Sequence, residues 1–303
     1  MRQLKSVVLA AALLGSCMQS HAAATSSAAL GPLTFTLFDL NPLDDTGPSV
    51  TFTNLVDAEF GSAVFANVFQ SDPNASDSQF AGGATDFDPV GIHVNTGLAW
   101  SMATVGGSGE ASGATLHVSG HAAGTTSTVP FSFHSSNYSA SVYAPYFFNA
   151  VGFTVSANTL LVITAESTVS AGVSSAFDPS SSYQIELADA ETMLYVIGPS
   201  ASGNSGAPQT SSDAHSLNIG NVIVYGDGCT SSYCYGPNAA SETRTLSVSF
   251  LNATGGNLAG TLQASATVNG TSFMQAVPEP ETYAMMLGGL VVVAQLARRR
   301  SAC

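Results

Sequence analysis

Apolar residues alternate with serine, threonine and other small residues along much of this chain, and this alternation limits the fold more than any other feature. Clear examples lie at residues 33–37, 246–250 and 262–268. A period of two places one side of an extended strand in a core and leaves the other side in water, as in antiparallel sheets. No long stretch between residues 25 and 276 has the period of an amphipathic helix. We therefore expect an all-β protein.

Turn-forming residues divide the chain into many short strands. Short strands separated by Gly, Pro, Asn and Asp favour an antiparallel β-sandwich, jelly-roll-like or immunoglobulin-like, over alternating strands and helices. A turn at residues 252–257 predicts that strands 246–250 and 262–268 form a hairpin. Residues 25–276 form one β body or, alternatively, two packed sandwiches that meet near residues 145–150. Further strands are expected at residues 50–53, 63–69, 98–105, 114–119, 129–134, 150–155, 160–169, 182–188, 193–197 and 216–225.

The N-terminus has the features of a secretory signal peptide at residues 1–22. Arg2 and Lys5 precede an apolar stretch at residues 6–15, and small residues then offer a cleavage site after Ala22. A second site lies after Ala24. Cys17 follows Leu-Gly-Ser, which is typical of a lipoprotein processing site, so lipidation of Cys17 is an alternative. Cleavage at either site and lipidation of Cys17 would each accompany export, so we expect an exported protein.

The C-terminus carries three features in a fixed order: a proline-glutamate-proline segment, an uncharged stretch at residues 282–297 and a basic cluster. As a helix, the uncharged stretch would be about 24 Å long, shorter than the ~30 Å hydrocarbon core of a bilayer. Local thinning and snorkelling arginines offset the difference. We expect a membrane helix whose basic end stays in the cytoplasm. The residues concerned are Val277, Pro278, Glu279, Pro280, Arg298, Arg299 and Arg300.

Together these features resemble the PEP-CTERM sorting tail, over residues 277–303. The resemblance implies a Gram-negative bacterium that makes extracellular polysaccharide, and processing by a membrane protease called exosortase. It also implies export, transient anchoring in the inner membrane by the C-terminal helix, and then a place at the cell surface or outside the cell. An ordinary C-terminal anchor behind a proline linker is the alternative. The body resembles uncharacterised PEP-CTERM proteins at residues 39–42 and 155–160, which supplies no activity.

The acidic composition argues against nucleic acid as a partner. The chain has 6 Lys and Arg against 20 Asp and Glu, and Arg244 is the only cation between residues 6 and 297. Binding to nucleic acid requires a basic surface that displaces counterions.

Cysteine and histidine residues point to little metal chemistry. Cys229 and Cys234 lie close in the sequence, and export favours a disulfide between them. A metal held by this pair would need two further ligands nearby. His117 and His121 are four residues apart on a predicted strand and turn, without the glutamate of a metalloprotease motif. We expect both to be exposed or hydrogen-bonded histidines.

Oxygen-rich loops are the remaining metal candidates. Oxygen ligands suit Ca²⁺, but the acidic clusters of this chain lack the spacing of an EF-hand loop. Turn capping by Asp and Asn side chains is the simpler explanation. We expect no cofactor, and the first cluster is the place to look if calcium binds. The clusters are Asp39, Asn41, Asp44 and Asp45, and then Asp86 and Asp88.

Enzyme motifs are absent from the sequence: it has no nucleophile elbow, phosphate-binding loop or dinucleotide fingerprint. We therefore expect not an enzyme but a secreted or cell-surface protein with a structural or adhesive role in an extracellular polysaccharide matrix or biofilm. A secreted carbohydrate-binding module or glycan-active enzyme is the alternative. Two facing carboxylates in a cleft near Trp100 would favour the alternative, whereas a smooth sandwich with serine and threonine faces would favour the first function.

Overall fold

The structure is a computed structural model, and all regular elements in its described part are β-strands that pair antiparallel. This confirms the predicted all-β class, whereas the predicted signal helix and C-terminal membrane helix lie outside the described residues. Within the described part, no helix has the length and apolar character needed to cross a membrane. The described residues are 23–43, 47–53, 61–71, 74–84, 87–124, 133–145, 151–174, 181–202, 207–224, 234–235 and 238–276.

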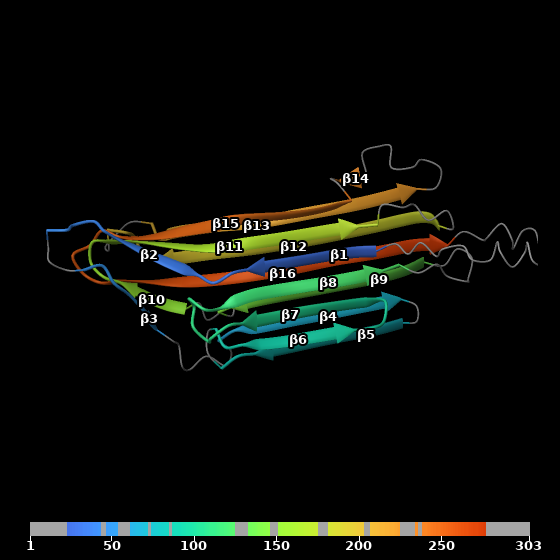
Figure 1. The fold of residues 1–303 in the computed structure, drawn as a ribbon, viewed down its shortest axis with the longest axis horizontal. Helices are drawn as coiled ribbons and strands as arrows, with labels where there is room; N and C mark the ends of the chain where they lie inside the picture. The colour runs from blue at the N-terminus through green and yellow to red at the C-terminus, as the bar shows by residue number, and fades with distance from the viewer. Residues whose placement is uncertain are drawn as a thin grey trace, which may run out of the picture.

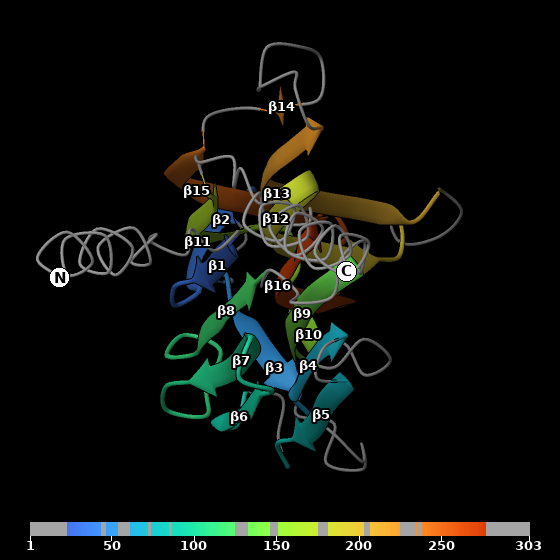
Figure 2. The ribbon, with the colours of Figure 1, turned by 90° about the vertical axis from the view of Figure 1, so that its right-hand side faces the viewer.

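Two sheets, of seven and nine strands, lie face to face with their strands along the long axis of the molecule (Figures 1 and 2). We call the first sheet A, and its strands follow the order β15 (Ala239–Asn252), β11 (Thr159–Val173), β1 (Ala23–Leu30), β8 (Thr115–Ala123), β7 (Ala99–Gly106) and β6 (Val90–Asn95), with β2 (Thr34–Asp39) also paired to β11. We call the second sheet B, and its strands follow the order β14 (Cys234–Tyr235), β13 (Gln209–Val224), β12 (Ser181–Gly198), β16 (Leu258–Ala276), β9 (Phe133–Ala144), β4 (Ala63–Ser71) and β5 (Asn74–Gly82), with β10 (Val151–Val155) joining β16 to β3 (Val50–Thr53).

The core lies between the two sheets and is built by the alternation seen in the sequence. In β11, every second residue from Thr159 to Val173 is buried, including Leu161 and Ile163. Rings of Phe153 and Phe250 meet edge to face at 4.9 Å between ring centroids. Alanine fills many of the other inward positions, so the apolar side chains leave little space between the sheets.

Strands from the two sides of residues 145–150 pair with each other in both sheets. In sheet A, β11 lies between β15 and β1, and in sheet B, β16 lies between β12 and β9. The buried apolar residues form one continuous cluster across these strands. The two halves of the sequence therefore share both sheets and a single core.

The predicted hairpin between strands 246–250 and 262–268 is wrong. β15 pairs with β11 in sheet A, and β16 pairs with β12, β9 and β10 in sheet B, so residues 253–257 connect the two sheets. Asn252 holds this connection: its buried amide donates to the backbone oxygens of Val155, Ser156 and Gly256, at 3.1, 2.8 and 2.8 Å. Turn residues show where a chain reverses, but not whether the next strand stays in the same sheet.

Several other strands also differ from those expected, and β12 and β1 show the physical reason. Expected strands 182–188 and 193–197 are parts of the single strand β12, because Ala188, Ala190 and Thr192 continue the inward alternation with small or polar residues. β1 was not expected at all, and it begins at Ala23, two residues before the expected start of the body. Its inward residues are mostly small, which hides the alternation from a search for apolar residues.

Candidate functional site

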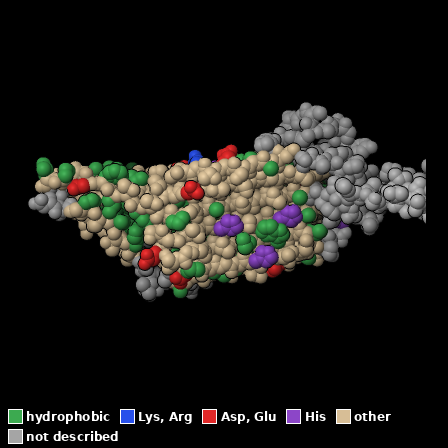
Figure 3. All heavy atoms as spheres, in the orientation of Figure 1, with side chains coloured by type: hydrophobic (Ala, Val, Ile, Leu, Met, Phe, Trp, Pro, Cys, Tyr) green, Lys and Arg blue, Asp and Glu red, His purple; other side chains and the backbone are tan. Residues whose placement is uncertain are grey.

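Three rings lie side by side on the outer face of sheet A. Trp100 on β7 lies between His93 on β6 and His121 on β8, with ring centroids 6.2 and 6.3 Å away. The Trp100 and His121 rings are stacked with 20° between their planes. We call His93, Trp100 and His121 the aromatic platform. Figure 3 shows histidine side chains gathered beside hydrophobic ones on this face of the molecule.

The register of the sheet brings these residues together. Trp100 pairs directly with His121 across β7 and β8, and with Asn95 across β6 and β7. The row continues from His121 to Thr25 on β1. Since side chains alternate between the faces of a strand, this row points outward while neighbours such as Ala99 and Ala122 are buried in the core. The result is a polar row with one large aromatic ring at its centre.

The aromatic platform itself contains no Lys, Arg, Asp or Glu side chain. Burial lowers the pKa of the His117 and His121 imidazoles, so both are unprotonated at neutral pH. Arg244, on β15, is the only Lys or Arg in the described part of the chain, and it is bound to Asp213 at 2.8 Å. The face that carries the platform therefore offers the neutral imidazoles of His117 and His121, together with the amide of Asn95 and the hydroxyl of Thr25 in the row of Trp100.

The structure separates His117 from His121 although both lie on the outer side of β8. Four residues of extended strand span roughly 13 Å, so the two imidazoles cannot bind the same ion. In the described residues, no group of three or more His, Cys, Asp or Glu side chains is arranged to hold a metal.

The loop after β2 begins with a turn of the kind expected for Asp and Asn. The Asp39 carboxylate accepts a hydrogen bond from the backbone N–H of Asn41 at 2.9 Å. Asp44, Asp45 and Asp86 lie outside the described residues, and the backbone oxygen of Asp88 accepts a hydrogen bond from Ser62. The Asp39 contact is thus local to its turn, whereas the Asp88 contact joins two segments that are distant in the sequence.

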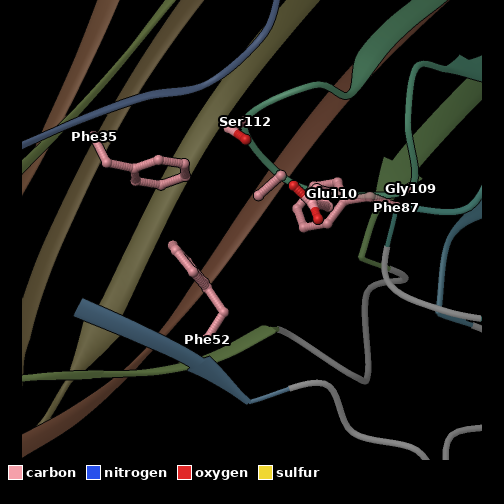
Figure 4. A pocket seen from close by; sticks show the side chains of 7 residues that line it. Phe35, Phe52, Phe87, Gly109, Glu110 and Ser112 are labelled. Carbon is pink, nitrogen blue, oxygen red and sulfur yellow. The ribbon is translucent and has the colours of Figure 1, made fainter.

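A hollow of about 340 Å³ lies near the end of the sandwich that carries β2, β3 and β10 (Figures 1 and 4). Phe35 and Phe52 form one wall, with ring centroids 4.9 Å apart, and Phe87 and Glu110 lie across from them. Glu110 supplies the only carboxylate among the described residues that line this hollow. A glycosidase uses a pair of carboxylates, and the described lining provides no such pair. Trp100 is not part of this hollow.

A hydrogen-bonded chain begins at Ser167, buried between the sheets, and runs through the buried His215 to Glu242, whose side chain is exposed. Ser167 Oγ is 2.8 Å from His215 Nδ1, and His215 Nε2 is 3.4 Å from Glu242. These residue types also occur in nucleophilic catalysis, but Ser167 has no exposed surface and is also bound to Thr192. A substrate carbonyl cannot reach it. The group therefore acts as a polar tie between the two sheets.

Several predicted site residues lie outside the described residues or have no described side chain. These are the cleavage residue Ala22, the lipidation candidate Cys17, Cys229, the sorting residues Val277, Pro278, Glu279 and Pro280, and the basic residues Arg298, Arg299 and Arg300. Cys234 lies in β14, but its side chain is not described. The disulfide, the cleavage site and the membrane helix stay predictions.

Comparison with known proteins identifies the C-terminal tail. Residues 276–301 match the family described as the PEP-CTERM protein-sorting motif. Together with the all-β body, this match places the chain among exported proteins that carry a C-terminal sorting signal. More specifically, the chain carries the PEP-CTERM motif, which implies processing by exosortase, a membrane protein. No curated protein and no solved structure matches the chain. The jelly-roll-like or immunoglobulin-like arrangement stays a prediction.

Sequence reasoning named Trp100 and His121 separately and missed His93. The turn at Asn95–Leu98 could have indicated that His93 lies near Trp100, because it aligns strands 90–95 and 99–106. His121 could not be added in the same way, because a longer loop separates β7 from β8.

Proposed function

We propose that this protein is an exported structural or adhesive component of an extracellular polysaccharide matrix, and that the aromatic platform contacts the polysaccharide. The sorting tail supplies the route out of the cell. The cross-strand row of Asn95, Trp100, His121 and Thr25 is the observation that supports the binding role.

The chemistry of the platform suits a neutral sugar chain. A pyranose ring has an apolar face of C–H groups, which packs against an aromatic ring, and a rim of hydroxyls that need hydrogen-bond partners. Trp100 supplies the ring, and Asn95 and Thr25 supply amide and hydroxyl groups on either side of it. His121 is neutral at pH 7 because burial lowers its pKa, so its imidazole both donates and accepts.

The shape of the site suits a long polymer better than a small molecule. The platform lies on the outer face of a sheet, and Trp100 lines neither of the two hollows found near Phe35 and Phe65. A small ligand needs a pocket that buries most of its surface, whereas a polymer gains its affinity from many shallow contacts along its length.

The test measures retention of the exported protein by polysaccharide extracted from the producing cells, by affinity electrophoresis with and without calcium. Trp100→Ala should weaken retention about tenfold, the effect of losing roughly 1.4 kcal/mol of contact energy. Phe80→Ala is the matched control, because Phe80 is an aromatic residue that is 44% exposed on β5 of the other sheet.

The outcomes separate two parts of the proposal. Equal retention of the wild type and Trp100→Ala would show that the platform is not the contact. Failure of the wild type to bind any extracted polysaccharide would remove the adhesive role. Thermal unfolding of each variant shows whether lost retention comes from a lost fold.

A further inference from the structure

Glu186 is a buried carboxylate at the end of the sandwich where β1 begins. It lies on the inward side of β12 and has 0% of its surface exposed. Moving a carboxylate out of water costs several kcal/mol unless charge and hydrogen bonds compensate it. Glu186 therefore requires hydrogen-bond donors or a counter-charge close to its carboxylate.

One carboxylate oxygen of Glu186 is well satisfied, and the other is not. Oε1 accepts hydrogen bonds from the backbone N–H of Ala23 at 2.8 Å, from Gln184 Nε2 at 2.9 Å and from the Ser174 hydroxyl. Oε2 is buried and has no hydrogen-bond partner among the described residues. All three donors to Oε1 are neutral, and burial raises the pKa of the carboxyl against their effect.

The described part of the chain offers no side-chain cation for this carboxylate. Arg244 is its only Lys or Arg, and Arg244 is bound to Asp213 and to the backbone oxygen of Ala214. The residue opposite Glu186 on β16 is Ser272, which is neutral. Among the described residues, the carboxylate thus lacks a counter-charge while Ala23 remains an ordinary residue within the chain.

We propose that export processing breaks the Ala22–Ala23 peptide bond, and that the new α-ammonium group of Ala23 pairs with Glu186. Water supplies the atoms: hydroxyl adds to the Ala22 carbonyl carbon, and the Ala23 nitrogen gains a proton as the C–N bond breaks. At neutral pH the amine takes up a second proton from solvent. The host's signal peptidase catalyses this hydrolysis.

The geometry for this pair is already present. The Ala23 nitrogen lies 2.8 Å from Oε1, and the backbone oxygen of Ala23 accepts a hydrogen bond from Ser174 at 2.9 Å. Residues Ala24–Leu30 are held between β8 and β11 on both sides. An amide has one N–H, whereas an ammonium has three donors. Cleavage therefore adds both the missing charge and a donor for Oε2, without moving β1.

The three N-termini predicted from the sequence differ in whether they place a positive charge beside Glu186. Cleavage after Ala24 would remove Ala23, which donates to Glu186, and Ala24, which is fully buried. Lipidation of Cys17 would leave Ala23 as an internal amide. Only cleavage after Ala22 supplies a cation at Glu186.

The composition of the chain makes the proposal directly testable. Lys5 is the only lysine in the sequence and is removed with the signal peptide. The α-amino group is then the sole primary amine of the mature protein. An amine-reactive N-hydroxysuccinimide ester therefore reports on this one group, in the exported protein as it is purified.

The experiment first identifies the N-terminal residue, which should be Ala23, and then measures labelling rates in buffer and in guanidinium chloride. The native wild type should label at least about tenfold more slowly than the denatured chain, since one unit of pKa increase leaves tenfold less free amine. Glu186→Gln should remove most of this protection. The matched control is Glu191→Gln, because Glu191 is exposed on the same strand and should leave the protection intact.

Three results would overturn the proposal. The first is an N-terminus at Thr25 or at a lipidated Cys17. The second is equal labelling of native and denatured wild type, which places the amine in solvent. The third is full protection in Glu186→Gln, which shows burial without pairing. If Glu186→Gln does not fold, the pH dependence of labelling separates pairing from burial: an amine paired with a carboxylate becomes reactive at higher pH in the native wild type than in the denatured chain. The same pH dependence in both states would overturn the proposal.

Discussion

The ring of Tyr138 lies directly against Gly270, its cross-strand partner in sheet B. The opposite side of the ring contacts Gly120 of β8 in sheet A, and the Tyr138 hydroxyl is 2.7 Å from Ser26 Oγ on β1. One aromatic side chain thus fills the space that two glycines leave between the sheets. A methyl group at either glycine would overlap the ring.

Gly270→Ala should therefore destabilise the protein by about 1–3 kcal/mol, because the Tyr138 ring is buried and has no free space to enter. Guanidinium denaturation of the exported protein measures the change. Gly255→Ala is the control, since no atom lies within 4 Å of a Cβ placed there, and its stability should stay near that of the wild type. Equal effects of the two substitutions would show that Tyr138 does not require the glycine.

Asn252→Ala should be among the most damaging single changes at the end of the sandwich. The substitution leaves the backbone oxygens of Val155 and Ser156 without their donor in a buried corner, at an expected cost of about 3 kcal/mol. Asn257→Ala in the same connection is the control, because Asn257 is exposed. The same denaturation experiment applies, and a cost no larger than that of the control would contradict the role of Asn252 in joining the sheets.

The pH dependence of stability should reveal Glu186 when the α-amine is neutralised by acetylation. Burial raises the carboxyl pKa in the folded state above its unfolded value. The folded state then holds the proton longer, so the free energy of unfolding falls as pH rises from about 4 towards the folded pKa. Acetylated Glu186→Gln should lack this fall, and the unmodified protein should show less of it because the ammonium offsets the charge.

Other titratable groups contribute to the pH dependence of stability, and their contribution must be subtracted. Among the described strands that pack against β12, β13 carries the titratable inward side chains Asp213 and His215, and His134 and Tyr138 lie one strand beyond β16, on β9. All four are present in the wild type and in Glu186→Gln, so the difference between the two pH profiles isolates Glu186. Identical profiles for the two acetylated proteins would exclude a buried charge at this position.

The sorting tail should control release from the inner membrane without affecting the fold. Replacing Pro278-Glu279-Pro280 with three alanines removes the motif within the matched residues 276–301. In a host that contains exosortase, the variant should stay in the inner membrane while the wild type leaves it, and the wild type should lose Arg298–Arg300 from its intact mass. Fractionation and mass spectrometry measure both. If the two proteins fractionate alike and the wild type keeps its arginines, the segment is only an anchor.

The sequence indicated single residues of the aromatic platform, but not that they form a cluster. Trp100 was identifiable as an aromatic residue on a predicted strand and His121 as a histidine in a predicted strand and turn, but their stacking depends on the β7–β8 register. Glu186 gave no signal, because nothing in the local sequence marks an inward acid on a strand that also carries the outward acids Asp189 and Glu191. Its partner Ala23 is 163 residues away along the chain.

The class of the fold, the acidic composition and the sorting tail follow from the amino-acid sequence alone, because they depend on local alternation, residue counts and a contiguous motif. The tertiary structure decided which strands share a sheet, and it placed β15 and β16 in different sheets. It also brought Ala23 to Glu186 and His93 to Trp100. The physical reason is that alternation specifies which side of a strand is buried, whereas the choice of partner strand depends on packing across the whole core.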